Sequence, residues 1–409
     1  MALLSLLAAK AWAQDGAPVL FRDSVSHCCI RDKFHSAEYT ARWTGACSNG
    51  QANGKGVLRW YLEGTLTAQY SGSMKDGIQD GPGDYQLEKG MRLKGNFHQG
   101  QLLDLAPAYL PMLQRHIVAI TDTAQNYVHD EGRSELFYYA LVPAKKITGV
   151  LVLLEGSWES AEHAISSNKA LCQLAADKGI AVLVPSVNQR LVLNTAIVQV
   201  LDTCFRDAIQ RYRLPADKFV LGGWSMGGLF SLRYTAMAYE DSNLVAVKPR
   251  AVFSVDGPVD LQNMYAKWAR DLDNPRNTNK YEPTYGMREL EQYLGGTPAT
   301  AAQQYVRYSV YSHGEKDGGS AQYLTTVPLR IYNDVDVNWW IDNRGVDLYG
   351  MNALDQSAMI NFLRGAGNEQ AAFINALGKG IRLEGFRHPH SWSVVDAKDC
   401  VDWLLRCLQ

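Results

Sequence analysis

The sequence lacks a strong excess of either charge, a long hydrophobic run and the common cofactor-binding motifs. Its 409 residues carry 40 basic and 42 acidic side chains, a formal net charge of −2, without long runs of Lys or Arg. Because nucleic-acid binding needs a basic surface, nucleic acid is not an expected partner. No stretch is apolar for long enough to form a transmembrane segment. P-loop, dinucleotide-binding and H-E-x-x-H motifs are also missing, so we predict neither a metal nor an organic cofactor.

Cysteine is scarce and odd in number. An oxidising compartment would allow up to three disulfides and leave one thiol over. The segment His27-Cys28-Cys29 lacks the C-x2-C spacing of a zinc site, so disulfides or buried thiols are expected instead. The seven cysteines are Cys28, Cys29, Cys47, Cys172, Cys204, Cys400 and Cys407.

The N-terminal residues 1–13 resemble a secretory signal peptide. An apolar run is followed by Ala11-Trp12-Ala13, a small-x-small cleavage pattern. This resemblance implies a secreted or periplasmic protein. The remaining composition, 46% hydrophobic and 20% charged, is typical of globular domains, and the length suits two or three of them.

A glycine repeat begins after residue 40. The first unit consists of Trp43 and the four glycines that follow it. The same spacing of an aromatic residue and four glycines recurs from Tyr70, and a third, partial copy starts at Gly95. Short alternating runs between the glycines favour strands, and the glycines would supply the positive φ of tight turns. The pattern resembles MORN repeats and predicts a small all-β hairpin module over residues 41–105. The resemblance implies protein or lipid contacts, and a packing module without a ligand is the equal alternative.

From residue 115 strands alternate with helices, which predicts an α/β domain over residues 115–409. We expect a mainly parallel sheet with helices on both faces. Residues 260–326 interrupt the alternation and are predicted to form an insertion that could act as a lid. The expected strands are 116–127, 136–142, 149–154, 180–185, 218–221, 250–255, 327–332 and 371–376, and the expected helices are 161–178, 193–212, 229–239, 353–363 and 394–408.

A G-x-S-x-G motif is centred on Ser225. It follows a β-rich run, 219–221, and precedes a helix, the context of a nucleophile elbow. Gly223 and Gly227 are needed there because side chains would clash with the neighbouring strand and helix. On this motif and the order of its elements, the domain resembles the α/β-hydrolase superfamily, in particular its esterase and prolyl-oligopeptidase-like branch.

This resemblance implies an acid and then a histidine later in the chain. The acid is expected just after the strand 327–332, where Asp336 is preferred and Asp334 is the alternative. The base is expected after the last strand, where the stretch 387–392 offers His390 in a His-x-Trp pattern and His388 as the alternative.

The implied chemistry is nucleophilic catalysis. His390 would take the Ser225 proton during attack, and Asp336 would orient the imidazole. The backbone N–H of Met226 is the expected first oxyanion donor, and the second is expected from Ser157 or Trp158.

Together these features predict a secreted or periplasmic serine hydrolase that cleaves small carboxylic esters through an acyl-enzyme on Ser225. One alternative is a peptidase of the prolyl-oligopeptidase-like type that acts on short peptides. Another is a catalytically silent binding or scaffold protein that uses the hairpin module, since a fold does not guarantee an activity.

Overall fold

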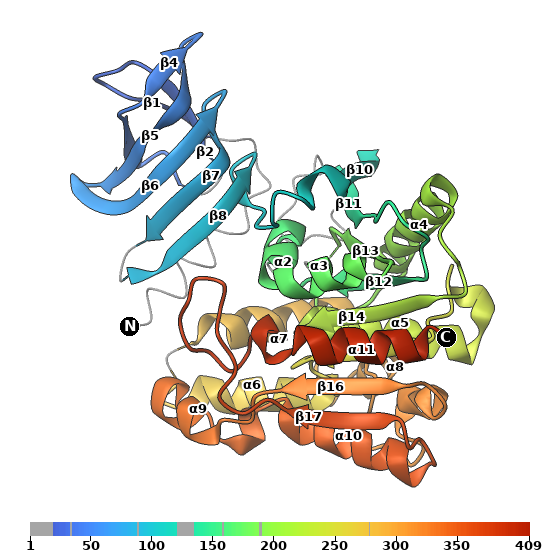
Figure 1. The fold of residues 1–409 in the computed structure, drawn as a ribbon. Helices are drawn as coiled ribbons and strands as arrows, with labels where there is room; N and C mark the ends of the chain where they lie inside the picture. The colour runs from blue at the N-terminus through green and yellow to red at the C-terminus, as the bar shows by residue number, and fades with distance from the viewer. Residues whose placement is uncertain are drawn as a thin grey trace.

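The computed structural model describes residues 19–32, 35–87, 90–120, 135–157, 159–187, 190–277 and 279–409. The predicted signal peptide, 1–13, lies outside these ranges. The described residues form an N-terminal all-β sheet and a second sheet with helices around it (Figure 1). No helix within them has the length and apolarity needed to cross a membrane.

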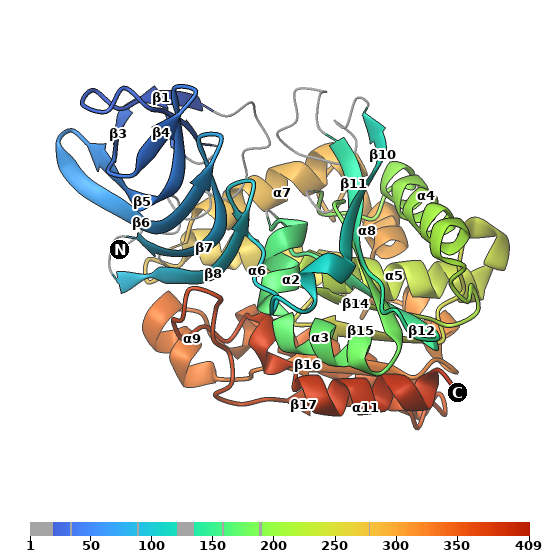
Figure 2. The same ribbon diagram turned by 45° about the horizontal axis from the view of Figure 1, so that its top comes forward.

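The first sheet has the order β1-β2-β5-β6-β7-β8-β9, with β3 and β4 paired to β5. From β5 onward, neighbours in the chain pair as antiparallel hairpins, and Figure 2 shows them as a curved ribbon. The strands are β1 Val19–Arg22, β2 Cys29–Asp32, β3 Tyr39–Trp43, β4 Ala46–Ser48, β5 Gln51–Leu62, β6 Thr65–Lys75, β7 Ile78–Leu87, β8 Arg92–His98 and β9 Gln101–Leu102.

Close packing of rings on backbone explains half of the repeated glycines. Each aromatic ring covers the glycines two and thirteen positions after it. A Cβ added to Gly45 would lie less than 3.0 Å from the Trp43 ring, and one added to Gly83 would lie equally close to Tyr70. Atoms at such distances overlap, so any side chain would displace the ring. The first and fourth glycines of each unit therefore leave room for the aromatic ring to pack on the backbone.

The second glycine of each unit serves a turn, as predicted, and the third has a positive φ within a strand, at Gly54 in β5 and Gly81 in β7. Gly50 has a φ of +75° and Gly77 a φ of +83°, the left-handed region that glycine adopts without a Cβ penalty. The prediction that all four glycines supply positive φ is wrong for the first and fourth, which lack a positive φ and pack against the ring.

One disulfide is present in this sheet, between Cys28 just before β2 and Cys47 in β4. The other cysteines are free thiols, three of them buried: Cys29, Cys172, Cys204, Cys400 and Cys407.

The second sheet has the order β10-β11-β13-β12-β14-β15-β16-β17. Strands β12 to β17 run parallel, whereas β11 is antiparallel to both β10 and β13. The sheet is therefore mixed, which corrects the prediction of a mainly parallel one. Its strands are β10 Leu113–Ile120, β11 Glu135–Leu141, β12 Gly149–Leu154, β13 Ile180–Pro185, β14 Phe219–Trp224, β15 Ala251–Val255, β16 Leu329–Asn333 and β17 Ala371–Asn375.

Helices cover both faces of this sheet, as expected. One apolar cluster joins it to α2 Ala161–Ser167, α3 Lys169–Asp177 and α11 Ala397–Cys407. Another joins the opposite face to α4 Thr195–Tyr212, α5 Met226–Glu240 and α10 Ala353–Gly365 (Figure 1). The predicted helix 161–178 is two helices, because Asn168 ends α2 and turns its side-chain amide back to the Ala164 carbonyl.

The insertion between β15 and β16 is mostly helical. It contains α6 Leu261–Asp273, α7 Tyr281–Leu294 and α8 Ala302–Tyr308, followed by the 3-10 turn Gly319–Leu324. Asp260 caps α6 by accepting hydrogen bonds from two backbone N–H groups of its first turn. Helix α6 and the segment that leads into α7 border the cavity described below.

The two sheets are joined by polar and apolar contacts. The Asp104 backbone N–H donates to Ser166 Oγ at 2.8 Å, and its carboxylate accepts from Lys169 Nζ at 2.9 Å. From the loop after β17, Leu383 packs against the core of the first sheet. The hairpin module therefore contacts α2, α3 and this loop.

Candidate active site

Ser225 occupies the sharp turn between β14 and α5. Its backbone is strained, with φ +55° and ψ −124°, and its N–H donates to the Val255 carbonyl at 2.9 Å. A Cβ on Gly223 would collide with the Gly227 carbonyl, and one on Gly227 with the Leu154 carbonyl. The strand-turn-helix geometry predicted for G-x-S-x-G is present, and the glycines are needed for the predicted steric reason.

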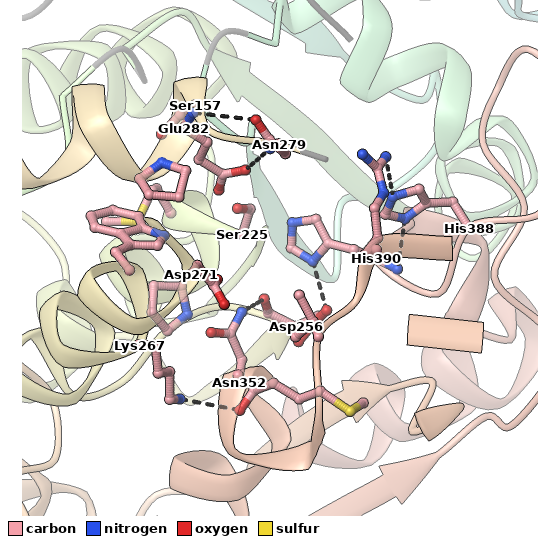
Figure 3. A pocket seen from close by; sticks show the side chains of 18 of the residues that line it. Ser157, Ser225, Asp256, Lys267, Asp271, Asn279, Glu282, Asn352, His388 and His390 are labelled. Carbon is pink, nitrogen blue, oxygen red and sulfur yellow. Dashed lines mark hydrogen bonds and ion pairs between the residues drawn. The ribbon is translucent and has the colours of Figure 1, made fainter. Parts of the chain in front are cut away.

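Ser225 opens onto a cavity of about 410 Å³. The insertion supplies one wall, and the loop between β17 and α11 supplies another. His390 and Asp256 line the same cavity (Figure 3). No group of three His, Cys, Asp or Glu side chains in the described part of the chain is placed to hold a metal ion.

His390 is paired with Asp256. Its Nδ1 lies 2.6 Å from Asp256 Oδ2. Asn333 Nδ2 donates to the other carboxylate oxygen at 2.7 Å, and Asn352 Nδ2 donates to the Asp256 carbonyl at 2.9 Å. Figure 3 shows the imidazole between Asp256 and Ser225, with its second nitrogen away from the carboxylate. An imidazole held in this way donates its Nδ1 proton to the acid and keeps Nε2 for the serine.

The structure does not place Asp336, the predicted acid, beside His390. Asp336 caps α9, Val337–Arg344, and its Oδ2 lies 2.9 Å from Arg387 Nη2. The alternative, Asp334, is fully buried and accepts from the backbone N–H groups of Gly378 and Gly380. It also pairs with Arg387 at 2.9 Å. Both carboxylates therefore fasten the loop that carries His390 without contacting its imidazole.

The sequence held a signal for Asp256 that was missed. Asp256 directly follows β15, one strand before the expected position, and β15 lies between β14 and β16. Because parallel strands end at one edge, an acid after either strand can reach the same site. At the end of β16 the chain places Asn333, which donates to Asp256. The carboxylate beside His390 therefore follows β15, and an amide, Asn333, stands at the end of β16.

His388, the alternative base, also lines the cavity, but its ring nitrogens contact Arg344 and the His390 backbone. Its Nδ1 accepts from the His390 backbone N–H at 3.2 Å, and Arg344 Nη2 lies 3.3 Å from its Nε2. Burial lowers the pKa of His388 well below its usual range, and the nearby charges of Arg382 and Arg344 lower it further. His388 is therefore a neutral support for the His390 backbone.

Two candidate oxyanion donors lie beside the elbow. Met226 is the first residue of α5, so no preceding helical turn accepts its backbone N–H. Ser157 also lines the cavity, and its buried hydroxyl has no hydrogen-bond partner among the described residues. The other predicted donor, Trp158, lies outside the described residues. The hydroxyl of Ser157 was not anticipated, because the prediction considered backbone N–H groups.

Comparison with known proteins gives matches among solved structures alone, since neither protein-family models nor curated proteins match this chain. An esterase of Thermogutta terrifontis is 13% identical, with a TM-score of 0.44 over 72% of this chain and 92% of its own. An S-formylglutathione hydrolase of Agrobacterium tumefaciens is 14% identical, with a TM-score of 0.42 over 73% of this chain and 95% of its own. One of two fungal esterases from Rhizomucor miehei is 14% identical, with a TM-score of 0.47 over 72% of this chain and 83% of its own. These similarities are distant, so a functional assignment rests on the residues of the cavity.

The loop that follows β17, residues 376–391, links the cavity to the hairpin module. It contributes His388 and His390 to the cavity, while Leu383 packs on the first sheet. In Figure 1 this dark red loop rises toward β8. The apolar contact of Leu383 therefore fixes the middle of the loop that carries His390.

We predict that Leu383→Ser lowers kcat/KM for ester hydrolysis by about tenfold, because small displacements of a catalytic base are costly. The melting temperature should change little. Leu377→Ser is the matched control, since Leu377 is on the same loop but 59% exposed. Equal activities of the two variants would contradict a positioning role for the hairpin module.

Proposed function

We propose that this chain is a serine hydrolase of the α/β-hydrolase type that cleaves carboxylic esters through an acyl-enzyme on Ser225. The observation that carries the proposal is His390 lying between the elbow serine and Asp256 at one cavity (Figure 3). A serine hydroxyl becomes an effective nucleophile when a neutral imidazole accepts its proton during attack.

In the proposed mechanism, His390 Nε2 accepts the Ser225 proton as Oγ attacks the ester carbonyl. Asp256 stabilises the imidazolium, and Asn333 fixes the carboxylate. The backbone N–H of Met226 and the Ser157 hydroxyl are the groups available to the oxyanion. His390 then gives its proton to the alcohol, which leaves. Water hydrolyses the acyl-enzyme by the same steps.

Glu159, in the loop before α2, offers no free carboxylate to a substrate amine. An aminopeptidase-like enzyme needs such a group to receive the substrate amine. Glu159 accepts from the Gly156 backbone at 2.9 Å and from Trp392 Nε1, and it is paired with His163. Its oxygens are thus used within the protein.

We also propose a secreted or periplasmic location. The Cys28–Cys47 disulfide supports it, because disulfides persist in oxidising compartments. The protein isolated from its source should then lack residues 1–13 by N-terminal sequencing, and an unprocessed chain would contradict the proposal.

Turnover of matched esters and amides tests the function. We expect the protein to hydrolyse 4-nitrophenyl acetate and butyrate at least about 10³-fold faster than Ser225→Ala does, in line with the contribution of an intact triad. Ser242→Ala, a change at an exposed serine, serves as the control. Cleavage of alanine 4-nitroanilide without any ester turnover would contradict the ester proposal and favour a peptidase.

A further inference from the structure

Two arginines line the cavity without an acidic partner. Arg344 and Arg382 are both half-buried, and no carboxylate in the described part of the chain lies within 4.0 Å of either guanidinium. Two other partly buried arginines have carboxylate partners: Arg190 pairs with Glu289 at 2.6 Å and Arg387 with Asp334 at 2.9 Å. The two cavity guanidiniums lack the carboxylate partner that Arg190 and Arg387 have.

Burial without a partner is unfavourable for these groups. Loss of solvent lowers the pKa of both guanidiniums, and Glu282 and Glu384 oppose that effect only through space. A guanidinium has five N–H donors and no acceptor, so it needs several oxygen partners when it leaves water. Arg344 has His388 Nε2 at 3.3 Å, and Arg382 has the face of the Trp224 ring at 4.5 Å. Most of their donors remain available to a ligand.

Both arginines are one side chain away from the proposed triad. Arg382 lies over Trp224, whose ring centroid is 4.7 Å from that of His390. Arg344 contacts His388, which accepts from the His390 backbone. A ligand group held by these arginines would therefore lie next to an ester that reacts at Ser225.

We propose that the substrate is an ester that also carries a carboxylate, and that Arg344 and Arg382 bind that carboxylate. This inference rests on the proposed function and specifies its substrate class. Guanidinium forks match carboxylates in geometry and charge. The third cation of the cavity, Lys267, is already paired with Asp355. The carboxylate takes no part in the reaction, in which water cleaves the ester to an acid and an alcohol.

A singly charged carboxylate fits this cavity better than a doubly charged phosphate. Asp271, Glu282 and Glu384 line the same cavity. Burial raises the pKa of Asp271 to about 6, so its carboxyl is mostly ionised at neutral pH. Negative charges on this wall would repel a dianion more strongly than a monoanion.

Paired esters test the inference, with the ratio of kcat/KM for the acidic ester to that for its neutral partner as the readout. The pairs are 4-acetoxybenzoate with methyl 4-acetoxybenzoate, and monomethyl adipate with methyl hexanoate. We expect a ratio of about 10 or more in at least one pair. Arg344→Gln and Arg382→Gln should each reduce that ratio by about 10-fold or more, mainly through KM. Arg406→Gln, which removes a charge from an exposed position on α11, should leave the ratio unchanged.

Neutral-ester turnover with a ratio near one in both pairs would overturn the inference and leave the hydrolase proposal standing. If no ester is hydrolysed, the hydrolase proposal fails, and calorimetric titration of Ser225→Ala with 4-acetoxybenzoate and monomethyl adipate tests the carboxylate site alone. Binding that weakens in Ser225→Ala combined with Arg344→Gln supports the site. Absence of binding by both ligands overturns it.

Discussion

Replacing Asp256 with Asn should lower kcat for ester hydrolysis by about 10⁴-fold, because an amide in this place favours the wrong imidazole tautomer and cannot stabilise the imidazolium. Asp256 is 6% exposed, and its carboxylate lies 2.6 Å from His390 Nδ1. Asn333 can still hydrogen-bond to an Asn at this position, so the fold should survive. The measurement is steady-state turnover of 4-nitrophenyl butyrate beside a thermal unfolding curve.

Asp336→Asn is the matched comparison. Asp336 caps α9 and pairs with the half-buried Arg387, so its loss should cost about 1 kcal/mol of stability and less than about tenfold in kcat. A larger loss of kcat in Asp336→Asn than in Asp256→Asn would show that the acid is the residue predicted from the sequence and not the residue in contact with His390.

Replacing His390 with Gln should remove the general base and lower kcat by about 10⁴-fold or more. His388→Gln should cost about tenfold or less, because the residue supplies one hydrogen bond to the His390 backbone. Both variants are measured on the same ester at neutral pH. Similar losses in the two variants, with both folded, would contradict the assignment of His390 as the single base.

Local sequence predicted the features that local chain geometry creates. The elbow at Ser225 needs a strand, a tight turn and a helix in direct succession, so a short local stretch of sequence is enough to recognise it. His390 was found by its place after the last strand. The glycine spacing after Trp43 likewise reflects a local contact. Its reason, the packing of the Trp43 ring on the backbone, is visible only in the structure.

Features that depend on distant parts of the chain were not predicted. Alternation of strands and helices does not show pairing direction, so the antiparallel placement of β11 was missed. The partner of His390 depends on how the loop 376–391 folds over the sheet edge. Arg387 draws that loop toward Asp334 and Asp336, and the imidazole then faces Asp256 instead. Tertiary packing therefore determines whether His390 faces the carboxylate after β15 or those after β16.

The central claim is that Ser225 is an activated nucleophile, and intact-mass analysis after treatment with a fluorophosphonate probe tests it most directly. We predict one covalent adduct on the wild-type protein, located on Ser225 by peptide mapping, and none on Ser225→Ala. Asp256→Asn should be labelled far more slowly, whereas Ser242→Ala should match the wild type. A folded wild-type protein that takes up no probe, or takes it up at another serine, would contradict the account.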